Sequence, residues 1–136
     1  MSELWPKEAA EFKSFLTNVG LDLQFEQESA AFGDRLIQYA NERISVRMIS
    51  DRGVWFIEVS DPSYETGDWY DVALFRDLLC GPGGEVLTLS EQAHFVRENW
   101  QSVLSSFESD NRNLTHARLG ALRRERAERR IPGLRI

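Results

Sequence analysis

The sequence predicts one α+β domain, in which an antiparallel sheet of three or four strands packs against an N-terminal helix and about three C-terminal helices. The length of 136 residues suits one hydrophobic core of ordinary size. Hydrophobic residues make up 42% of the chain, which is enough apolar material to offset the entropy of folding. Strand-like segments come first and helical segments afterwards, which is the order of α+β domains rather than of βαβ units. We therefore expect residues 1–136 to form a single domain.

One helix and several strands are predicted in the first half of the chain. Pro6 suits the first turn of a helix, apolar residues follow at helical spacing, and Gly20 supplies a stop, so the helix is expected over 6–19. Apolar and polar residues alternate over 21–25, which predicts a half-buried strand, and 26–34 is expected to be a loop. Three more strands, separated by turn residues, are predicted at 35–40, 44–50 and 54–60. The last of them is apolar on most of both faces and is expected to be central in the sheet.

Helices are predicted in the second half. Asp68 stands three residues before Asp71 in an arrangement that resembles a capping box, which predicts a short helix ending at Leu79. A glycine-rich segment then interrupts the chain. Either Thr88, paired with the glutamate three residues later, or Ser90 caps the next helix, whose apolar residues recur at spacings of three and four through residue 107.

A last helix is predicted from about residue 111 to residue 130. Asp110 can cap this helix, and the segment at 131–133 closes it. Its inward stripe is expected to consist of Leu114, Ala117, Ala121 and Leu122.

Charge is divided unevenly along the chain. Eight arginines and two glutamates give residues 111–136 a net charge of +6. Because the whole chain carries −6, residues 1–110 carry −12. An acidic body repels nucleic-acid backbones and favours basic partners. The Arg-rich helix at 111–132 is interpreted as a solvated face that also packs against the acidic body. Binding of RNA or phosphate is the weaker alternative, because no aromatic residue lies among these arginines to stack on bases.

Candidate catalytic groups are few, and we predict no catalytic residue, no metal site and no cofactor. His94 and His116 lie on different predicted helices without metal-ligand spacing, and each is interpreted as an exposed or boundary residue. Cys80 sits at a helix C-terminus, which disfavours a thiolate, and is interpreted as buried or incidental. The glycines at 81–84 follow a helix and precede no Gly-Lys-Ser or Gly-Lys-Thr, so they do not form a phosphate loop.

Acidic and aromatic residues are interleaved after residue 60. Caps, turns and a solvated edge can explain the acids, but aromatic residues inside a charged rim are also typical of protein interfaces. The predicted interface residues are Tyr64, Glu65, Asp68, Trp69, Tyr70 and Asp71, with the sheet edge as the alternative surface. Trp55 and Trp100 are expected in the core, whereas core and interface positions are equally compatible with the spacing around Trp69.

Five sequence blocks carry a family resemblance. They are RGVWFIEV at 52–59, DWYD at 68–71 with LL at 78–79, LSEQA at 89–93 and RENW at 97–100. Together they resemble small bacterial immunity proteins encoded beside polymorphic toxins of the contact-dependent inhibition and Rhs type. The resemblance spans about residues 30–132. It implies a cytoplasmic, non-catalytic protein that binds the C-terminal domain of its cognate toxin and blocks the active site or substrate surface of that domain.

Two other function classes stay open. An acidic secretion chaperone of the type III kind also begins with a helix and several strands, but it would need a second set of strands after residue 80. A small enzyme would need an apolar cleft that holds His94 or Cys80 beside a carboxylate.

The expected location is the cytoplasm. No run approaches the roughly 18 apolar residues of a membrane span, and the first residues lack a basic segment followed by an apolar one. A single cysteine also fits a reducing compartment.

Overall fold

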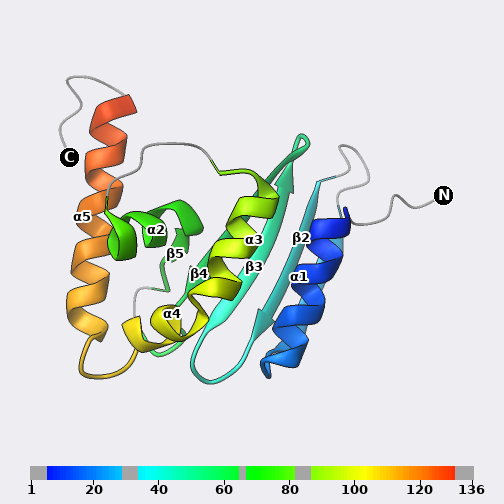
Figure 1. The fold of residues 1–136 in the computed structure, drawn as a ribbon, viewed down its shortest axis with the longest axis horizontal. Coiled ribbons are helices and arrows are strands. Elements are labelled where there is room, and N and C mark those ends of the chain that lie inside the picture. Colours follow the sequence, from blue (N-terminus) through cyan, green and yellow to red (C-terminus); the bar gives the residue numbers. More distant parts are fainter. Residues whose placement is uncertain (1–5, 29–33, 65–66, 82–86, 131–136) are drawn as a thin grey trace.

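A computed structural model describes residues 6–28, 34–64, 67–81 and 87–130, and it confirms the predicted α+β domain (Figure 1). A sheet of five antiparallel strands follows the first helix, and helices make up the rest of the described chain. The elements are α1 (Lys7–Asn18), β1 (Asp22–Glu28), β2 (Arg35–Ala40), β3 (Ser45–Asp51), β4 (Val54–Ser60), β5 (Trp69–Asp71), α2 (Val72–Cys80), α3 (Leu89–Glu98), α4 (Trp100–Ser106) and α5 (Arg112–Arg130).

The strands follow one another across the sheet in the order β1-β2-β3-β4-β5, and all neighbours are antiparallel. The strands predicted at 35–40, 44–50 and 54–60 are confirmed. The strand β1 continues to Glu28, through a part of the segment that was expected to be a loop. The strand β4 has a neighbour on each side, although β3 is the middle strand.

The fifth strand arises where the sequence predicted the start of a helix. Residues 69–71 pair with β4 before the chain turns into α2. The N-cap of α2 is therefore Asp71 rather than Asp68, and its carboxylate accepts a hydrogen bond from the Leu74 N–H at 3.1 Å. A strand of only three residues is too short to show a periodicity of its own in the sequence.

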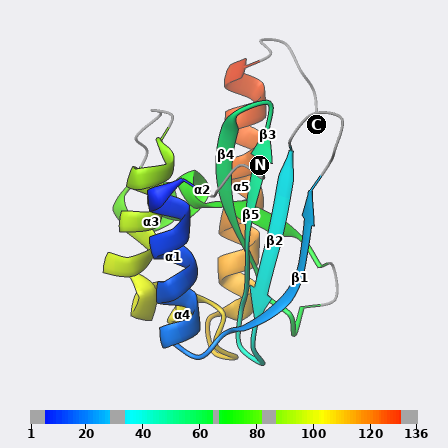
Figure 2. The ribbon, with the colours of Figure 1, turned by 90° about the vertical axis from the view of Figure 1, so that its right-hand side faces the viewer.

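The two faces of the sheet differ in their cover. Figure 2 shows α1, α3 and α4 on one side of the sheet, which we call the inner face. Side chains that oppose one another across four strands fill this face, and Tyr39, Val46, Val59 and Tyr70 form one such buried row. The opposite side is called the outer face below. In an antiparallel sheet with one covered and one open face, successive side chains of a strand alternate between the two faces.

Two of the predicted helices begin as expected, and one predicted helix is divided in two. The predicted helix at 6–19 is confirmed as α1, and the capping box of Thr88 and Glu91 starts α3. The single helix expected through residue 107 is divided into α3 and α4 at Asn99, whose side chain donates to the Phe95 carbonyl at 2.9 Å. Such a side chain competes with the backbone for hydrogen bonds and ends the regular helix. Trp100 lies in the core, as predicted.

Gln92 of α3 completes the hydrogen bonding of β4. Because β5 pairs only with Glu58–Ser60, the preceding part of β4 lacks a strand on that side. The buried Gln92 side chain occupies this place: it accepts from the Ile57 N–H at 2.7 Å and donates to the Trp55 carbonyl at 3.1 Å. One side chain thus replaces a strand neighbour and fixes α3 on the sheet.

Replacing Gln92 by leucine, which has a similar volume, is expected to lower the free energy of unfolding by about 2 kcal/mol, because the Ile57 N–H loses its partner in the protein interior. Urea denaturation followed by circular dichroism measures this difference. The control is Gln101→Leu at an exposed position of α4, which should change the value by less than about 0.5 kcal/mol. Equal effects of the two substitutions would contradict the assigned role of Gln92.

Among the described residues, the helices lack the combination of length and apolar character that a membrane crossing requires.

Candidate functional site

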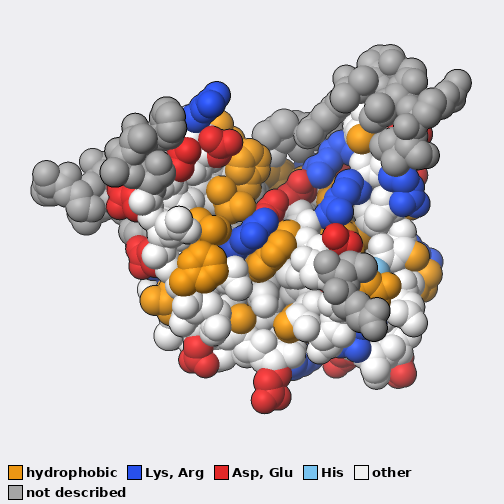
Figure 3. Space-filling view, turned by 180° about the vertical axis from the view of Figure 1, so that it is seen from behind, with side chains coloured by type: hydrophobic (Ala, Val, Ile, Leu, Met, Phe, Trp, Pro, Cys, Tyr) orange, Lys and Arg blue, Asp and Glu red, His pale blue; other side chains and the backbone are white. Residues whose placement is uncertain are grey.

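The outer face of the sheet carries a mixed apolar and charged surface that none of α1, α3 and α4 covers (Figures 2 and 3). Figure 3 shows hydrophobic side chains beside a line of basic and acidic ones on this side of the molecule. We call this surface the outer sheet surface. It consists of Phe25, Leu36, Arg47, Ile49, Phe56, Glu58, Trp69 and Asp71.

The apolar part is one row across three strands. Leu36 opposes Ile49, which in turn opposes Phe56. Phe56 is 39% exposed, and Phe25 on β1 is 43% exposed. Two large apolar side chains are thus exposed on one face of the sheet, with the half-buried Leu36 and Ile49 on the strands between them, and accessible apolar surface of this kind is typical of protein-binding sites.

The charged part of the outer sheet surface holds an aromatic ring in place. The guanidinium of Arg47 lies 2.7 Å from Oε1 of Glu58, and it covers the ring of Trp69 with its carbon 4.1 Å from the ring centroid. All three side chains are half-buried. Trp69 therefore occupies the outer face, not the core. A side chain that is fixed before binding loses less entropy when a partner arrives.

The Arg-rich helix α5 packs against the β5 end of the sheet. Arg126 makes a two-pronged ion pair with Asp71, with nitrogen–oxygen distances of 2.6 and 3.2 Å. Arg123 donates to the Trp69 carbonyl and lies over the ring of Tyr70 at 4.7 Å. These contacts confirm that the basic helix packs against the acidic body.

A buried carboxylate connects the start of α5 to the segment after β4. Asp61 is 1% exposed, and its Oδ2 accepts from Nε of Arg112 at 2.7 Å and lies 3.2 Å from Nε2 of His116. Its Oδ1 accepts from the Ser63 N–H at 3.0 Å. Three donors thus surround this carboxylate, as a buried charge requires.

His116 lies in the interior, which corrects the expectation of an exposed or boundary histidine. Its Nδ1 is 2.8 Å from the Tyr70 hydroxyl. Since the Asp61 carboxylate can only accept, Nε2 carries a proton, and in the neutral ring Nδ1 accepts the hydroxyl proton of Tyr70. Tyr64 stacks on the ring at a centroid distance of 3.6 Å, and Phe107 lies at 5.5 Å. These neighbours leave His116 6% exposed.

The position of His116 also corrects the inward stripe of α5. The buried residues are Thr115, His116 and Leu119, whereas Leu114 and Ala117 are exposed. The expected stripe counted apolar residues only. The helix is instead rotated toward the hydrogen-bonding partners of its histidine. Of the other two expected members of the stripe, Ala121 and Leu122 are both half-buried.

The Asp61, His116 and Tyr70 side chains have the order of a charge relay, but their burial indicates a structural role. Tyr70 is 2% exposed, and burial, followed by the nearby Asp68 carboxylate, raises the pKa of its hydroxyl above 10.0. The hydroxyl thus keeps its proton and serves as a hydrogen-bond donor to His116. We therefore interpret these residues as the joint that fixes α5 to the body, and call them the α5 joint.

The raised pKa of Tyr70 predicts how stability depends on alkaline pH. The unfolded chain loses this proton near pH 10.0 while the folded chain still holds it, so the contribution is complete below that pH and is lost as the pH rises through the folded pKa. The free energy of unfolding should therefore fall as the pH rises from about 10 through the folded pKa of Tyr70. Tyr70→Phe should make this fall shallower, as measured by urea denaturation, and an equal slope in the variant would contradict the assignment. Tyr39, whose pKa burial also raises, maintains part of the slope.

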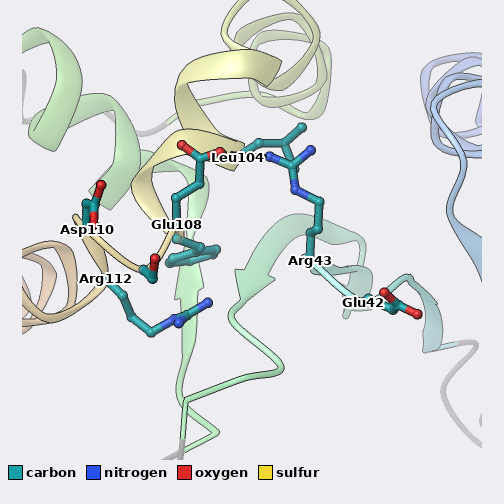
Figure 4. A pocket seen from close by; sticks show the side chains of 8 residues that line it. Glu42, Arg43, Leu104, Glu108, Asp110 and Arg112 are labelled. Atoms are coloured by element: carbon teal, nitrogen blue, oxygen red, sulfur yellow. Dashed lines mark hydrogen bonds and ion pairs between the residues drawn. The ribbon is translucent and has the colours of Figure 1, made fainter.

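A polar pocket lies beside the α5 joint (Figure 4). It has a volume of about 420 Å³, and charged side chains of both signs line it. Arg43 pairs across it with Glu108 at 3.4 Å, and Arg112 extends from it toward Asp61. The charges of the pocket are thus largely compensated within the protein. The lining residues are Glu42, Arg43, Leu104, Phe107, Glu108, Ser109, Asp110 and Arg112.

The enzyme hypothesis requires His94 or Cys80 in a cleft, and both residues lie away from the pocket beside the α5 joint. His94 is exposed on α3, as expected. Cys80 is exposed at the C-terminal end of α2. Neither lines the pocket beside the α5 joint. Among the described residues, no group of three or more His, Cys, Asp or Glu side chains could hold a metal ion.

The structure separates the predicted interface residues into two groups. Trp69 and Asp71 belong to the outer sheet surface. Tyr64 and Tyr70 contact His116 instead, and Tyr70 is buried. The other two predicted residues do not join either group: Asp68 is half-buried and its carbonyl accepts from the Ser60 hydroxyl at 2.8 Å, and Glu65 lies outside the described residues.

Sequence reasoning missed most of the outer sheet surface. Its members on β2, β3 and β4 are alternate residues of strands that were predicted at the right positions. Successive side chains of a strand point to opposite faces of the sheet, and the sequence did not show which face the helices cover. The face that they leave uncovered is the accessible one.

Comparisons with protein-family models, with curated proteins and with solved structures find no match for this chain.

Proposed function

We propose that this chain is an immunity protein that neutralises a cognate bacterial toxin domain by stoichiometric binding. The observation that carries this proposal is the outer sheet surface, where Phe25 and Phe56 are exposed, Trp69 is half-buried under Arg47, and charged side chains lie among them. Aromatic anchors inside a partly charged surface are the composition of binding hot spots. The family resemblance of the sequence supplies the class of partner.

The charge of the body supports a basic toxin domain as the partner. Residues 1–110 carry a net charge of −12. A field of this sign accelerates the encounter with a basic protein and disfavours acidic competitors. The ion pairs of Arg112 and Arg126 with Asp61 and Asp71 engage part of the basic helix within the chain. The chain as a whole keeps a net charge of −6.

A secretion chaperone is less well supported. That hypothesis requires strands after residue 80, and the described residues beyond Cys80 contain α3, α4 and α5 and no strand. In the described chain the sheet ends with β5, so the described residues after Cys80 supply helices and the His116 side chain of the α5 joint.

A growth assay tests the proposal. The C-terminal domain of the protein encoded immediately upstream is induced in a bacterial host, with this chain or with an unrelated acidic protein of similar size as the control. We expect the domain to lower the viable count, this chain to restore the count, and the two to co-purify at a fixed ratio. A harmless domain, or one that kills equally with this chain present, would reject immunity to that neighbour.

A further inference from the structure

We infer that the outer edge of β1 binds an extended basic segment of the partner, which adds to the sheet as a sixth strand. The inference relies on the proposed function for the identity of the partner, whereas the edge itself is a feature of the described chain. The strand β1 pairs with β2 on one side, and no described strand pairs with its other side. All seven of its residues are exposed.

The opposite end of the sheet is covered by other elements, whereas no described element pairs with the outer edge of β1. At that end β5 is only three residues long, Gln92 completes the hydrogen bonding of β4, and α5 packs alongside. Natural sheets also guard their edges with proline, charged residues and bulges. The sequence of β1, DLQFEQE, contains no proline and no lysine; its guards are its carboxylates, which a basic strand would neutralise, and one irregularity between Leu23 and Phe25. The regular run from Phe25 to Glu28 is thus suited to strand addition.

The negative charge of the β1 edge determines which kind of segment can bind there. Asp22, Glu26 and Glu28 give β1 three carboxylates and no basic residue. Arg35 of β2 lies 3.7 Å from Glu28, which remains 50% exposed. A second copy of this strand would bring three more carboxylates to the same edge, and like charges opposite one another destabilise a sheet. The edge therefore favours a basic segment of another protein over self-association.

The register of β1 specifies the pattern of that segment. Glu26 and Glu28 oppose Ile37 and Arg35, which lie on the inner face, so their side chains also project toward that side. Phe25 lies on the outer face. An added strand would place basic residues opposite the two glutamates and an apolar residue opposite Phe25. Such a strand extends the outer sheet surface and forms one continuous interface with it.

A peptide of alternating lysine and valine is the direct probe. Added to the full chain, it should shift the NMR signals of the amides at 25–28 and slow their hydrogen exchange. Two further peptides carry N-methyl groups on all lysines or on all valines. Because the N–H groups of alternate residues in a strand point to the same side, one of these two must lose binding.

Charge variants test whether the peptide binds the β1 edge itself or is attracted by the net negative charge of the whole chain. Glu26→Lys with Glu28→Lys should weaken binding of the peptide by about tenfold or more, because the paired charges now repel. Glu125→Lys with Glu128→Lys makes the same change of net charge at exposed positions of α5, and this variant should retain most of the affinity of the native chain for the peptide. Urea denaturation verifies that both variants are folded. The inference is overturned if the peptide at about millimolar concentration shifts no amide of β1, if both variants bind equally, or if both methylated peptides still bind.

The same variants in the growth assay distinguish the two claims. If the native chain restores growth and Glu26→Lys with Glu28→Lys restores it equally, strand addition is wrong and the proposed function stands. If the native chain does not restore growth, the proposed function fails, and the peptide measurement still decides the role of the edge.

Discussion

Replacing Asp61 by alanine is expected to lower the free energy of unfolding by about 3 kcal/mol and the melting temperature by about 10 °C. The substitution removes the common acceptor of Arg112, His116 and the Ser63 N–H. His116 has 4% of its side chain exposed and cannot replace this partner with bulk water, whereas Arg112 has 26% exposed and recovers part of its hydration. Thermal and urea denaturation measure the loss.

Two substitutions calibrate this result. Asp61→Asn retains an acceptor oxygen and should lose roughly half as much stability. Glu11→Ala removes an exposed carboxylate of α1 and should cost less than about 0.5 kcal/mol. A loss at Asp61→Ala as small as that at Glu11→Ala would mean that the α5 joint is not what fixes α5 to the body.

Replacing Phe56 by serine is expected to weaken binding of the proposed toxin partner by about thirtyfold or more while leaving the fold intact. Phe56 is 39% exposed at the end of the apolar row, so its removal takes away an anchor for the partner rather than a core residue. The substitution does not alter the net charge, and electrostatic attraction is therefore unchanged. Isothermal titration calorimetry measures the affinity, and the growth assay reports its consequence.

Leu79→Ser is the matched control for this prediction. Leu79 is 37% exposed, nearly the same as Phe56, but it lies on α2 rather than on the outer sheet surface. The control variant should bind as the native chain does. Equal affinity of both variants and the native chain would exclude Phe56 from the interface.

Local patterns were sufficient to predict most elements of the fold. Strand-like segments bounded by turn residues located β2, β3 and β4, and the capping box at Thr88 located the start of α3. The three-residue strand β5 was missed because its pairing with β4 depends on a contact between segments rather than on its own sequence. The break at Asn99 was missed because the apolar spacing continues through it.

The α5 joint and the outer sheet surface depend on distant contacts. Asp61 and Arg112 are 51 residues apart, and Asp71 and Arg126 are 55 apart, so no local spacing connects them. The sequence did place acids near residue 60 and arginines after residue 111, and their attraction was foreseen. The burial of His116 was not foreseen, because a histidine is placed inward by its partners rather than by its own polarity.

Footprinting of the complex with the toxin domain by hydroxyl radicals tests the central claim most directly, because it reports the exposure of individual side chains. We expect Phe25, Phe56 and Trp69 to become protected when the complex forms. Leu79 on α2 and Leu114 on α5, both exposed in the chain alone, should react as before. Protection at these two leucines, with the outer sheet surface still reactive, would contradict the claim that the partner binds the sheet.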